Sequence, residues 1–192
     1  IQRLVGSEMC IRDSSKGNKI NFVAIRKQKK WEDESWVSEG NMQELLSVFS
    51  SWNKDVLELF SKSDNLHKWG LYERKSIKKL VNGNLLLMGD AAHPMLPFLA
   101  QGSCLAIEDA YSFSELLKIN TNLNKTLTNY QKLRLKRGNK IQVKSRIQGY
   151  MNHLSNRYLI FLRNVFLRIF GKSLQDSIHK YNAIKEIKHL PK

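Results

Sequence analysis

The sequence predicts an α/β fold, in the form of an α+β fragment, on three observations. Apolar runs bounded by turn residues, which are typical of strands, occur before residue 90. Beyond Gly102, apolar residues recur at helical spacing almost to the C-terminus. Between these two parts, an apolar run at residues 85–88 ends in Gly-Asp. With 192 residues, 42% of them hydrophobic, the chain is long enough to bury a core.

The local pattern places each element in order. The expected strands are residues 19–25 (KINFVAI), 31–37 (WEDESWV), 68–75 (KWGLYERK) and 85–88 (LLLM), the last preceded by a tight turn at Asn82-Gly83. The expected helices are residues 45–52, 54–60, one from Gly102 to a break at 120–124, 127–153, 158–170, and a last polar helix before Pro191.

Two details of the helices matter for packing. An apolar stripe on the helix after Gly102 contains Leu105, Ala106, Ala110, Phe113, Leu116 and Leu117. Gly171 follows the helix at 158–170 and suits a C-cap, so we expect that helix to end there.

Residues 1–14 (IQRLVGSEMCIRDS) show no clear period. Their GSEMCIRDS portion resembles a translated sequencing-adapter read-through. We therefore expect these residues to be non-native and exclude them from the fold prediction. On that interpretation the natural chain begins upstream, and this sequence is a fragment.

The formal net charge is +15, and the charged residues are unevenly distributed along the chain. No Asp or Glu occurs between Glu115 and Asp176, where Lys and Arg are frequent. Such a segment attracts phosphates, anionic lipid or anionic substrates, although lysines on a solvated helix face produce the same pattern. No apolar run is long enough to span a membrane, no export signal is visible, and the two cysteines fit neither a disulfide framework nor a metal site. We expect a soluble cytoplasmic protein without a metal.

The segment LLLMGDAAHPMLPFLAQGSCLAIEDA, residues 85–110, carries the chemistry. A strand followed by Gly-Asp, a loop and a helix is typical of α/β nucleotide sites, where ligands lie beyond the carboxyl ends of strands. The Asp90 carboxylate can accept hydrogen bonds from ribose or ribityl hydroxyls, and Gly89 permits a close backbone approach. Pro97 stiffens the loop, and the N–H groups at Gly102 and Ser103 can stabilise an anion. Each dipeptide alone could equally be a simple turn or a helix entry.

Taken together, the segment resembles the C-terminal flavin motif of the FAD-dependent aromatic-ring hydroxylases, which are single-component flavoprotein monooxygenases. The matching residues are Gly89, Asp90, Ala91, Ala92, His93, Pro97, Gln101, Gly102, Ala106, Glu108, Asp109 and Ala110. Weaker similarity over residues 17–153 points to the salicylate hydroxylase-like branch. The resemblance implies the C-terminal half of a para-hydroxybenzoate hydroxylase-like FAD-binding fold.

On this resemblance the chain divides into four parts. These are the suspect residues 1–14, the remainder of a substrate-binding domain at 15–80, the C-terminal part of an FAD-binding domain at 81–153, and basic C-terminal helices at 154–192.

The resemblance also implies roles in cofactor binding for Gly89, Asp90, Pro97, Gln101, Gly102 and Ser103. Asp90 would hydrogen-bond the ribityl chain of FAD, and the backbone at 101–103 would face the anionic pyrimidine end of the flavin. Pro97 would shape the wall between flavin and substrate. NADH or NADPH would be the reductant, with O2 and a small aromatic substrate as partners, and no nucleic acid is expected.

Other polar residues of the segment receive structural interpretations. Glu108 and Asp109 are neighbours on a helix and point about 100° apart, so we interpret them as surface or packing residues and not as a catalytic pair. His93 could act as a general base, but we expect it to order the loop. Cys104 lies in the first turn of the helix, where a thiolate would be favoured. We nevertheless interpret it as a small residue that packs beside the flavin.

The chain departs from the family in two respects. No G-x-G-x-x-G fingerprint is present, so we expect the chain alone to be inactive and to bind FAD weakly or not at all. The segment where related enzymes often carry substrate-domain His or Tyr residues is occupied by the suspect GSEMCIRDS, so we assign no catalytic residue. The alternative is a basic helical module in which residues 125–172 bind an anionic membrane surface or nucleic acid. The run YLIFLRNVFLRIFGK favours the membrane version of that alternative.

Overall fold

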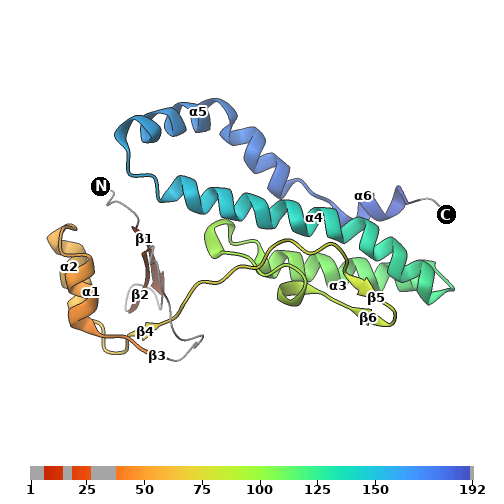
Figure 1. Cartoon of the computed structure of the whole chain (residues 1–192), viewed down its shortest axis with the longest axis horizontal. Helices are drawn as coiled ribbons and strands as arrows, with labels where there is room; N and C mark the ends of the chain where they lie inside the picture. Colours follow the sequence, from red (N-terminus) through yellow and green to blue (C-terminus); the bar gives the residue numbers. More distant parts are fainter. Residues whose placement is uncertain (1–6, 15–18, 27–37, 191–192) are drawn as a thin grey trace. The chain divides into compact units, whose positions relative to one another are not determined.

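The computed structural model describes residues 7–14, 19–26 and 38–190 (Figure 1). The chain divides into two compact units. The first comprises residues 1–71 and 152–160, and the second comprises residues 72–151 and 161–192. The candidate site lies wholly within the second unit.

Two small sheets belong to the first unit. Strand β1 (Ser7–Ser14) pairs antiparallel with β2 (Lys19–Arg26), which confirms the strand predicted at 19–25. The backbone of β1 comes from the segment that was set aside as non-native. The strand predicted at 31–37 lies outside the described residues.

The second sheet of this unit is shorter than predicted. Strand β3 (Ser38–Glu39) pairs with β4 (His67–Lys68), and no strand continues through residues 69–75, so the prediction for 68–75 is wrong beyond its first residue. Within this run, the Arg74 carbonyl oxygen accepts a hydrogen bond from the Gln142 side chain at 2.8 Å, so this group bonds a side chain and not a neighbouring strand.

Helix α2 (Lys54–Ser61) confirms the helix predicted at 54–60, whereas α1 (Met42–Val48) begins and ends earlier than the predicted 45–52, so the prediction is wrong for residues 49–52. Asn side chains cap both N-termini, at Asn41 and Asn53. An aromatic cluster fixes the pair, because the Phe60 ring contacts both Phe22 and Phe49 with centroids 4.7 and 5.6 Å apart.

The second unit begins with a hairpin of β5 (Val81–Asn82) and β6 (Leu85–Leu86). Gly83 turns the chain with φ +57°, which confirms the predicted turn. The strand predicted at 85–88 is paired only at its first half. Among the described residues, all strand pairs are antiparallel.

Four helices follow: α3 (Gly102–Ile119), α4 (Leu123–Asn152), α5 (Arg157–His179) and α6 (Ala183–Lys188). A break between α3 and α4 is confirmed, but it covers residues 120–122 and not 120–124, because α4 already begins at Leu123. The predicted end at Gly171 is wrong, because α5 continues for two further turns. A Cβ at Gly171 would meet no atom within 4 Å, so no close contact breaks the helix there.

The buried faces of these helices differ from the predicted stripe. Leu105 and Leu116 of α3 are fully buried as predicted, whereas Leu117 is 46% exposed and Ala110 is also exposed. Apolar side chains of the hairpin, α3, α4 and α6 form one cluster, comprising Leu80, Ala92, Leu116, Tyr130 and Ile187. A second cluster contains Leu105, Ile141 and Ile178.

The described helices include none that is both long enough and apolar enough to cross a membrane.

Candidate functional site

The candidate site is the loop between β6 and α3, residues 89–101, which we call the Gly89 loop. It contains two short 3-10 helices, η2 (Gly89–Ala91) and η3 (Pro97–Leu99). Gly89 adopts φ +56°, a conformation that favours glycine, and a Cβ there would lie 3.4 Å from the Cβ of Ala106. Asp90 and Pro97 are both exposed.

The start of α3 adjoins Asp90. Gln101 is the N-cap residue but donates and accepts no side-chain cap bond, and the first turn contains no acidic residue. A Cβ placed on Gly102 would lie 3.7 Å from Asp90 Oδ1, so the carboxylate lies next to the first turn of the helix. Ser103 is exposed there as well. An exposed acceptor and an uncapped helix N-terminus therefore share one surface.

This surface offers two complementary kinds of group. The Asp90 carboxylate accepts hydrogen bonds from hydroxyl groups, and the N–H groups of Gly102 and Ser103 face a negative charge favourably. The residues therefore fit a ligand that carries hydroxyls next to an anionic end, and the ribityl-flavin portion of FAD has both.

Helix α4 supports the Gly89 loop through glycines. A Cβ on Gly138 would lie 2.1 Å from the His93 ring, and a Cβ on Gly149 would lie 2.5 Å from the Phe98 ring. These glycines are three helical turns apart and so share one face of α4. Any larger residue at either position would displace the loop.

Polar side chains on the same face of α4 bind the loop backbone. Gln142 donates to the carbonyl oxygen of Pro94 at 2.7 Å, and the Ser145 hydroxyl donates to that of Leu96. Both side chains are buried. Their hydrogen bonds satisfy backbone groups that would otherwise be buried without a partner.

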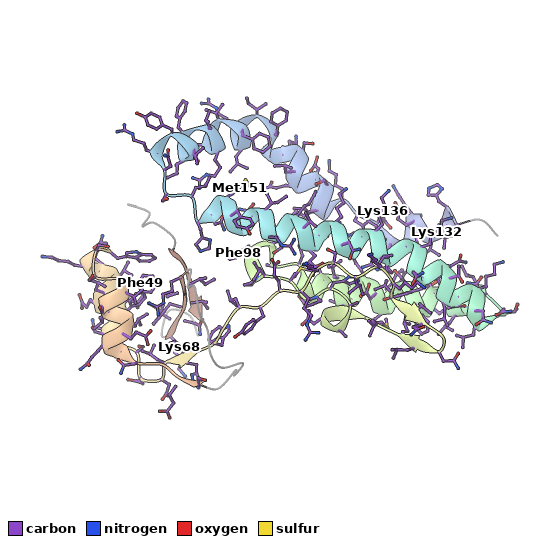
Figure 2. All side chains as sticks on the ribbon, viewed as in Figure 1. Phe49, Lys68, Phe98, Lys132, Lys136 and Met151 are labelled. Atoms are coloured by element: carbon purple, nitrogen blue, oxygen red, sulfur yellow. The ribbon has the colours of Figure 1, made fainter. Side chains whose placement is uncertain are left out.

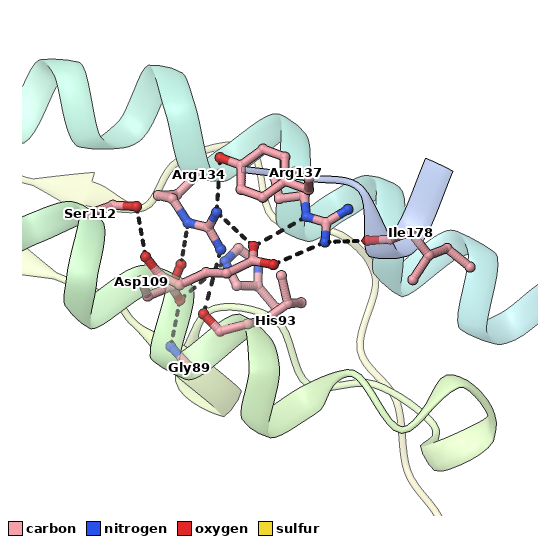
Figure 3. Close-up of polar contacts among 10 residues, drawn as sticks. Gly89, His93, Asp109, Ser112, Arg134, Arg137 and Ile178 are labelled. Atoms are coloured by element: carbon pink, nitrogen blue, oxygen red, sulfur yellow. Dashed lines mark hydrogen bonds and ion pairs between the residues drawn. The ribbon is translucent and has the colours of Figure 1, made fainter. Parts of the chain in front are cut away.

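An ionic network lies beneath the start of the loop, formed by Glu108, Asp109, Arg134 and Arg137 (Figure 3). Asp109 Oδ2 accepts the Gly89 N–H at 2.9 Å, and Oδ1 accepts Arg134 Nε at 2.6 Å. Asp109 and Arg134 are both 0% exposed. A buried, fully paired carboxylate thus fixes the backbone immediately before Asp90.

The second acidic residue binds both arginines. Glu108 Oε2 lies 2.9 Å from Arg134 Nη1, and Arg137 contacts the same carboxylate through Nη2 and Nε at 3.0 and 3.2 Å. Arg137 is 6% exposed. Two arginines and two carboxylates therefore balance their charges inside the unit, as burial of charge requires.

The network shifts the proton affinities of its members. Burial opposes the charge on Arg134, but the hydrogen bond and charge of Asp109 outweigh it, and the pKa of Arg134 lies above its ordinary value. Burial lowers the pKa of His93, and the charge of Asp109 only partly offsets this. His93 is therefore neutral near pH 7.

His93 occupies the space between the loop and α4. Its Nε2 lies 3.7 Å from Asp109 Oδ2, too far for a hydrogen bond, and in the described part of the chain neither ring nitrogen has a hydrogen-bond partner. The ring is 1% exposed. This position agrees with a residue that orders the loop, and it keeps the imidazole away from solvent.

The sequence interpretation missed most of this network. From the sequence alone, Asp109 is interpreted as a surface or packing residue. The structure buries it in an ion pair with Arg134, so it is a packing residue. Arg134 and Arg137 were counted with the basic segment, because no acidic residue lies near them in the sequence. One feature of the sequence could have identified these two arginines: they lie at helical spacing from Tyr130 and Ile141, which are both fully buried.

Comparisons with known proteins agree with this geometry. The chain matches the family model FAD_binding_3, described as FAD binding domain, over residues 8–145. It is 35% identical over 136 residues to 3-amino-4-hydroxybenzoate 2-monooxygenase PtnB3 of Streptomyces platensis, covering 70% of this chain and 34% of that protein. It is 32% identical over 138 residues to 3-hydroxybenzoate 6-hydroxylase 2 of Aquipseudomonas alcaligenes, covering 71% and 43%.

A solved structure, a salicylate hydroxylase substrate complex, matches with a TM-score of 0.81 and 25% identity, over 96% of this chain and 47% of that one. The chain belongs to the FAD binding domain family, and its resemblance to FAD-dependent aromatic hydroxylases and the predicted fold class are confirmed. It spans between about a third and a half of the length of these relatives.

Proposed function

We propose that this chain is part of a cytoplasmic FAD-dependent monooxygenase that hydroxylates an aromatic or related small substrate with O2 and NADH or NADPH. The observation that supports this most strongly is the exposed Asp90 carboxylate beside the uncapped start of α3, in a chain of the FAD binding domain family. Two of its relatives are named as a monooxygenase and a hydroxylase of substituted benzoates.

The residues of this chain would bind and orient the cofactor. Asp90 would accept hydrogen bonds from ribityl hydroxyls, and the N–H groups at Gly102 and Ser103 would stabilise the anionic end of the flavin. Gly89 and Gln101 would provide backbone close to the ring system, and Pro97 would lie on the substrate side. FAD, when bound and reduced, supplies the chemistry that activates O2.

Flavin content of the intact protein tests this assignment. Asp90→Ala removes the acceptor, and the loss of a charge-assisted hydrogen bond of about 1.5–3 kcal/mol predicts FAD binding weaker by about tenfold or more. Asp64→Ala, at an exposed aspartate of the first unit, is the matched control. Flavin absorbance after gel filtration measures the retained cofactor. Equal retention in Asp90→Ala and the control would reject the site.

A second function, peripheral contact with an anionic membrane, is favoured by one surface of α5. Between residues 161 and 170 this helix exposes Phe161, Leu162, Val165, Phe166, Ile169 and Phe170. Arg168 and Lys172 are exposed on the same helix, and no acidic residue precedes Asp176 there. A basic helix with an apolar face is suited to the membrane interface, and we propose this contact as an addition to the enzymatic function.

Vesicle co-sedimentation tests the membrane proposal. Binding to vesicles that contain phosphatidylserine should fall when Arg168 and Lys172 are both replaced by Gln, because each basic residue near an anionic surface contributes about 1 kcal/mol. Lys132→Gln with Lys136→Gln, two exposed lysines of α4, is the matched control (Figure 2). Absence of binding at low salt would remove this function.

A further inference from the structure

The C-terminal segment of residues 178–187 contacts the ionic network directly. Arg137 Nη2 donates to the carbonyl oxygen of Ile178 at 2.9 Å, and Arg134 Nη1 lies 3.2 Å from the Tyr181 hydroxyl. The Tyr181 ring also lies against both guanidinium groups, with its centroid 4.4 Å from Arg137 Cζ and 5.5 Å from Arg134 Cζ. The family match ends at residue 145, well before this segment.

Core contacts fix the segment on both sides of Tyr181. Ile178 packs with Leu105 and Ile141 in one apolar cluster, and Ile187 packs with Leu80 and other residues in the other. Both isoleucines are 9% exposed. Tyr181 is therefore held against the arginines by packing and not by its hydrogen bond alone.

From Tyr181 the contacts continue to the Gly89 loop without a gap. Tyr181 restrains Arg134, Arg134 binds Asp109 Oδ1, and Asp109 Oδ2 binds the Gly89 N–H. These side chains form one connected buried network, in which Arg134 also pairs with Glu108 Oε2 at 2.9 Å, so a change at one end alters the freedom of the other.

We propose that Tyr181 is a positioning residue for the flavin site: through Arg134 and Asp109 it fixes the backbone at Gly89 and hence the direction of Asp90. Its consequence for FAD rests on the proposed function above. Burial raises the pKa of Tyr181, so the phenol stays neutral and presents its oxygen to Arg134.

Amide hydrogen exchange of the chain tests the proposal without any cofactor. Tyr181→Phe removes the oxygen and keeps the ring, and we expect exchange at Gly89 to be about threefold faster; Tyr181→Ala removes both and should make it about tenfold faster. The Val81 amide, which donates to Gln131 instead, is the internal reference and should not change. Tyr158→Phe, at a residue 72% exposed on α5, is the matched control.

Two results would overturn the proposal. One is exchange at Gly89 that is unchanged in both Tyr181 variants; the other is a rise of the same factor at Gly89 and Val81, which would indicate a general loss of stability. If Tyr181→Ala does not fold, the same comparison in Tyr181→Phe decides. FAD titration of the intact protein then measures the consequence, a dissociation constant about threefold higher in Tyr181→Phe.

The two proposals fail in different ways. If Asp90→Ala leaves FAD binding unchanged, the proposed flavin site is wrong, while exchange at Gly89 still decides the role of Tyr181. If Gly89 exchange does not respond to Tyr181, the positioning role is wrong even where Asp90→Ala lowers FAD binding.

Discussion

Helices α4 and α5 place their polar and apolar residues in opposite ways. Helix α4 is rich in basic and amide residues, yet it buries Arg134, Gln142 and Ser145 at no more than 1% exposure. Helix α5 is rich in Phe, Leu and Ile, yet Phe161 and Ile169 remain 66% and 65% exposed. Burial in this unit therefore follows the partners that a side chain finds and not its hydropathy.

The functional reason for the difference lies in the Gly89 loop. A loop carries many backbone N–H and C=O groups, and only polar side chains can satisfy those that are buried. Helix α4 supplies these side chains and two glycines that admit His93 and Phe98. An apolar helix in the same place could cover the loop but could not hold its backbone.

The largest expected effect comes from breaking the buried ion pair. Arg134→Met leaves Asp109 buried without its main partner, and we expect the free energy of unfolding to fall by about 3–5 kcal/mol. Lys136→Met, an exposed position on the same helix, should change it by no more than about 0.5 kcal/mol. Urea unfolding measures both. Similar values for the two variants would contradict the buried network.

Glycine substitutions compare the two helices directly. Gly138→Ala on α4 places a Cβ 2.1 Å from the His93 ring, and overpacking of this kind costs about 1–3 kcal/mol. Gly171→Ala on α5 meets no atom within 4 Å, so helix propensity alone predicts a gain of up to about 1 kcal/mol. Thermal unfolding of the two variants should shift in opposite directions, and a shift of the same sign would contradict the contrast.

The buried His93 predicts a dependence of stability on pH. Because its pKa is lowered in the folded state, the unfolded chain binds a proton first as the pH falls below about 6.5. This residue's contribution to stability is therefore complete above that pH and declines below it, by at most about 1.4 kcal/mol per pH unit. Unfolding curves at pH 7.5 and 5.5 should show the decline, and His93→Gln should reduce it. An identical decline in the variant would exclude His93 as its source.

The smallest effect is expected on the exposed face of α5. Phe161→Ala should alter the free energy of unfolding by no more than about 0.5 kcal/mol, because little area is buried there. Ile141→Ala, at a fully buried position of α4, should cost about 2–5 kcal/mol and serves as the comparison. A large loss in Phe161→Ala, measured by urea unfolding, would show that this face is covered within the chain.

Local signals predicted much of this structure. The β-branched run at residues 19–25, the Asn82-Gly83 turn and the start of α3 at Gly102 are each determined by neighbouring residues, and each is confirmed. The family resemblance of residues 85–110 located the candidate site. The structure places Asp90 beside Gly102 at the start of α3, and the roles of the site residues in binding FAD stay predictions.

What the sequence did not predict depends on distant partners. The pairing of Asp109 with Arg134 joins two helices, and although helical spacing puts Arg134 on the face of Tyr130 and Ile141, no local pattern names Asp109 as its partner. The helix end predicted at Gly171 is wrong because glycine permits a C-cap but does not require one, and α5 continues through this residue to His179. In the run predicted as a strand at 68–75, the Arg74 carbonyl accepts its hydrogen bond from Gln142 of α4, a partner 68 residues away in the sequence.

We propose that FAD binds where Asp90 meets the start of α3, on a loop fixed by the ionic network. Hydrogen exchange of the intact protein with and without FAD, followed by mass spectrometry of peptides, tests this proposal most directly. Exchange should slow in peptides that cover residues 89–91 and 102–105 when FAD is added and should not change in α2. Slower exchange elsewhere, with residues 89–105 unchanged, would contradict it.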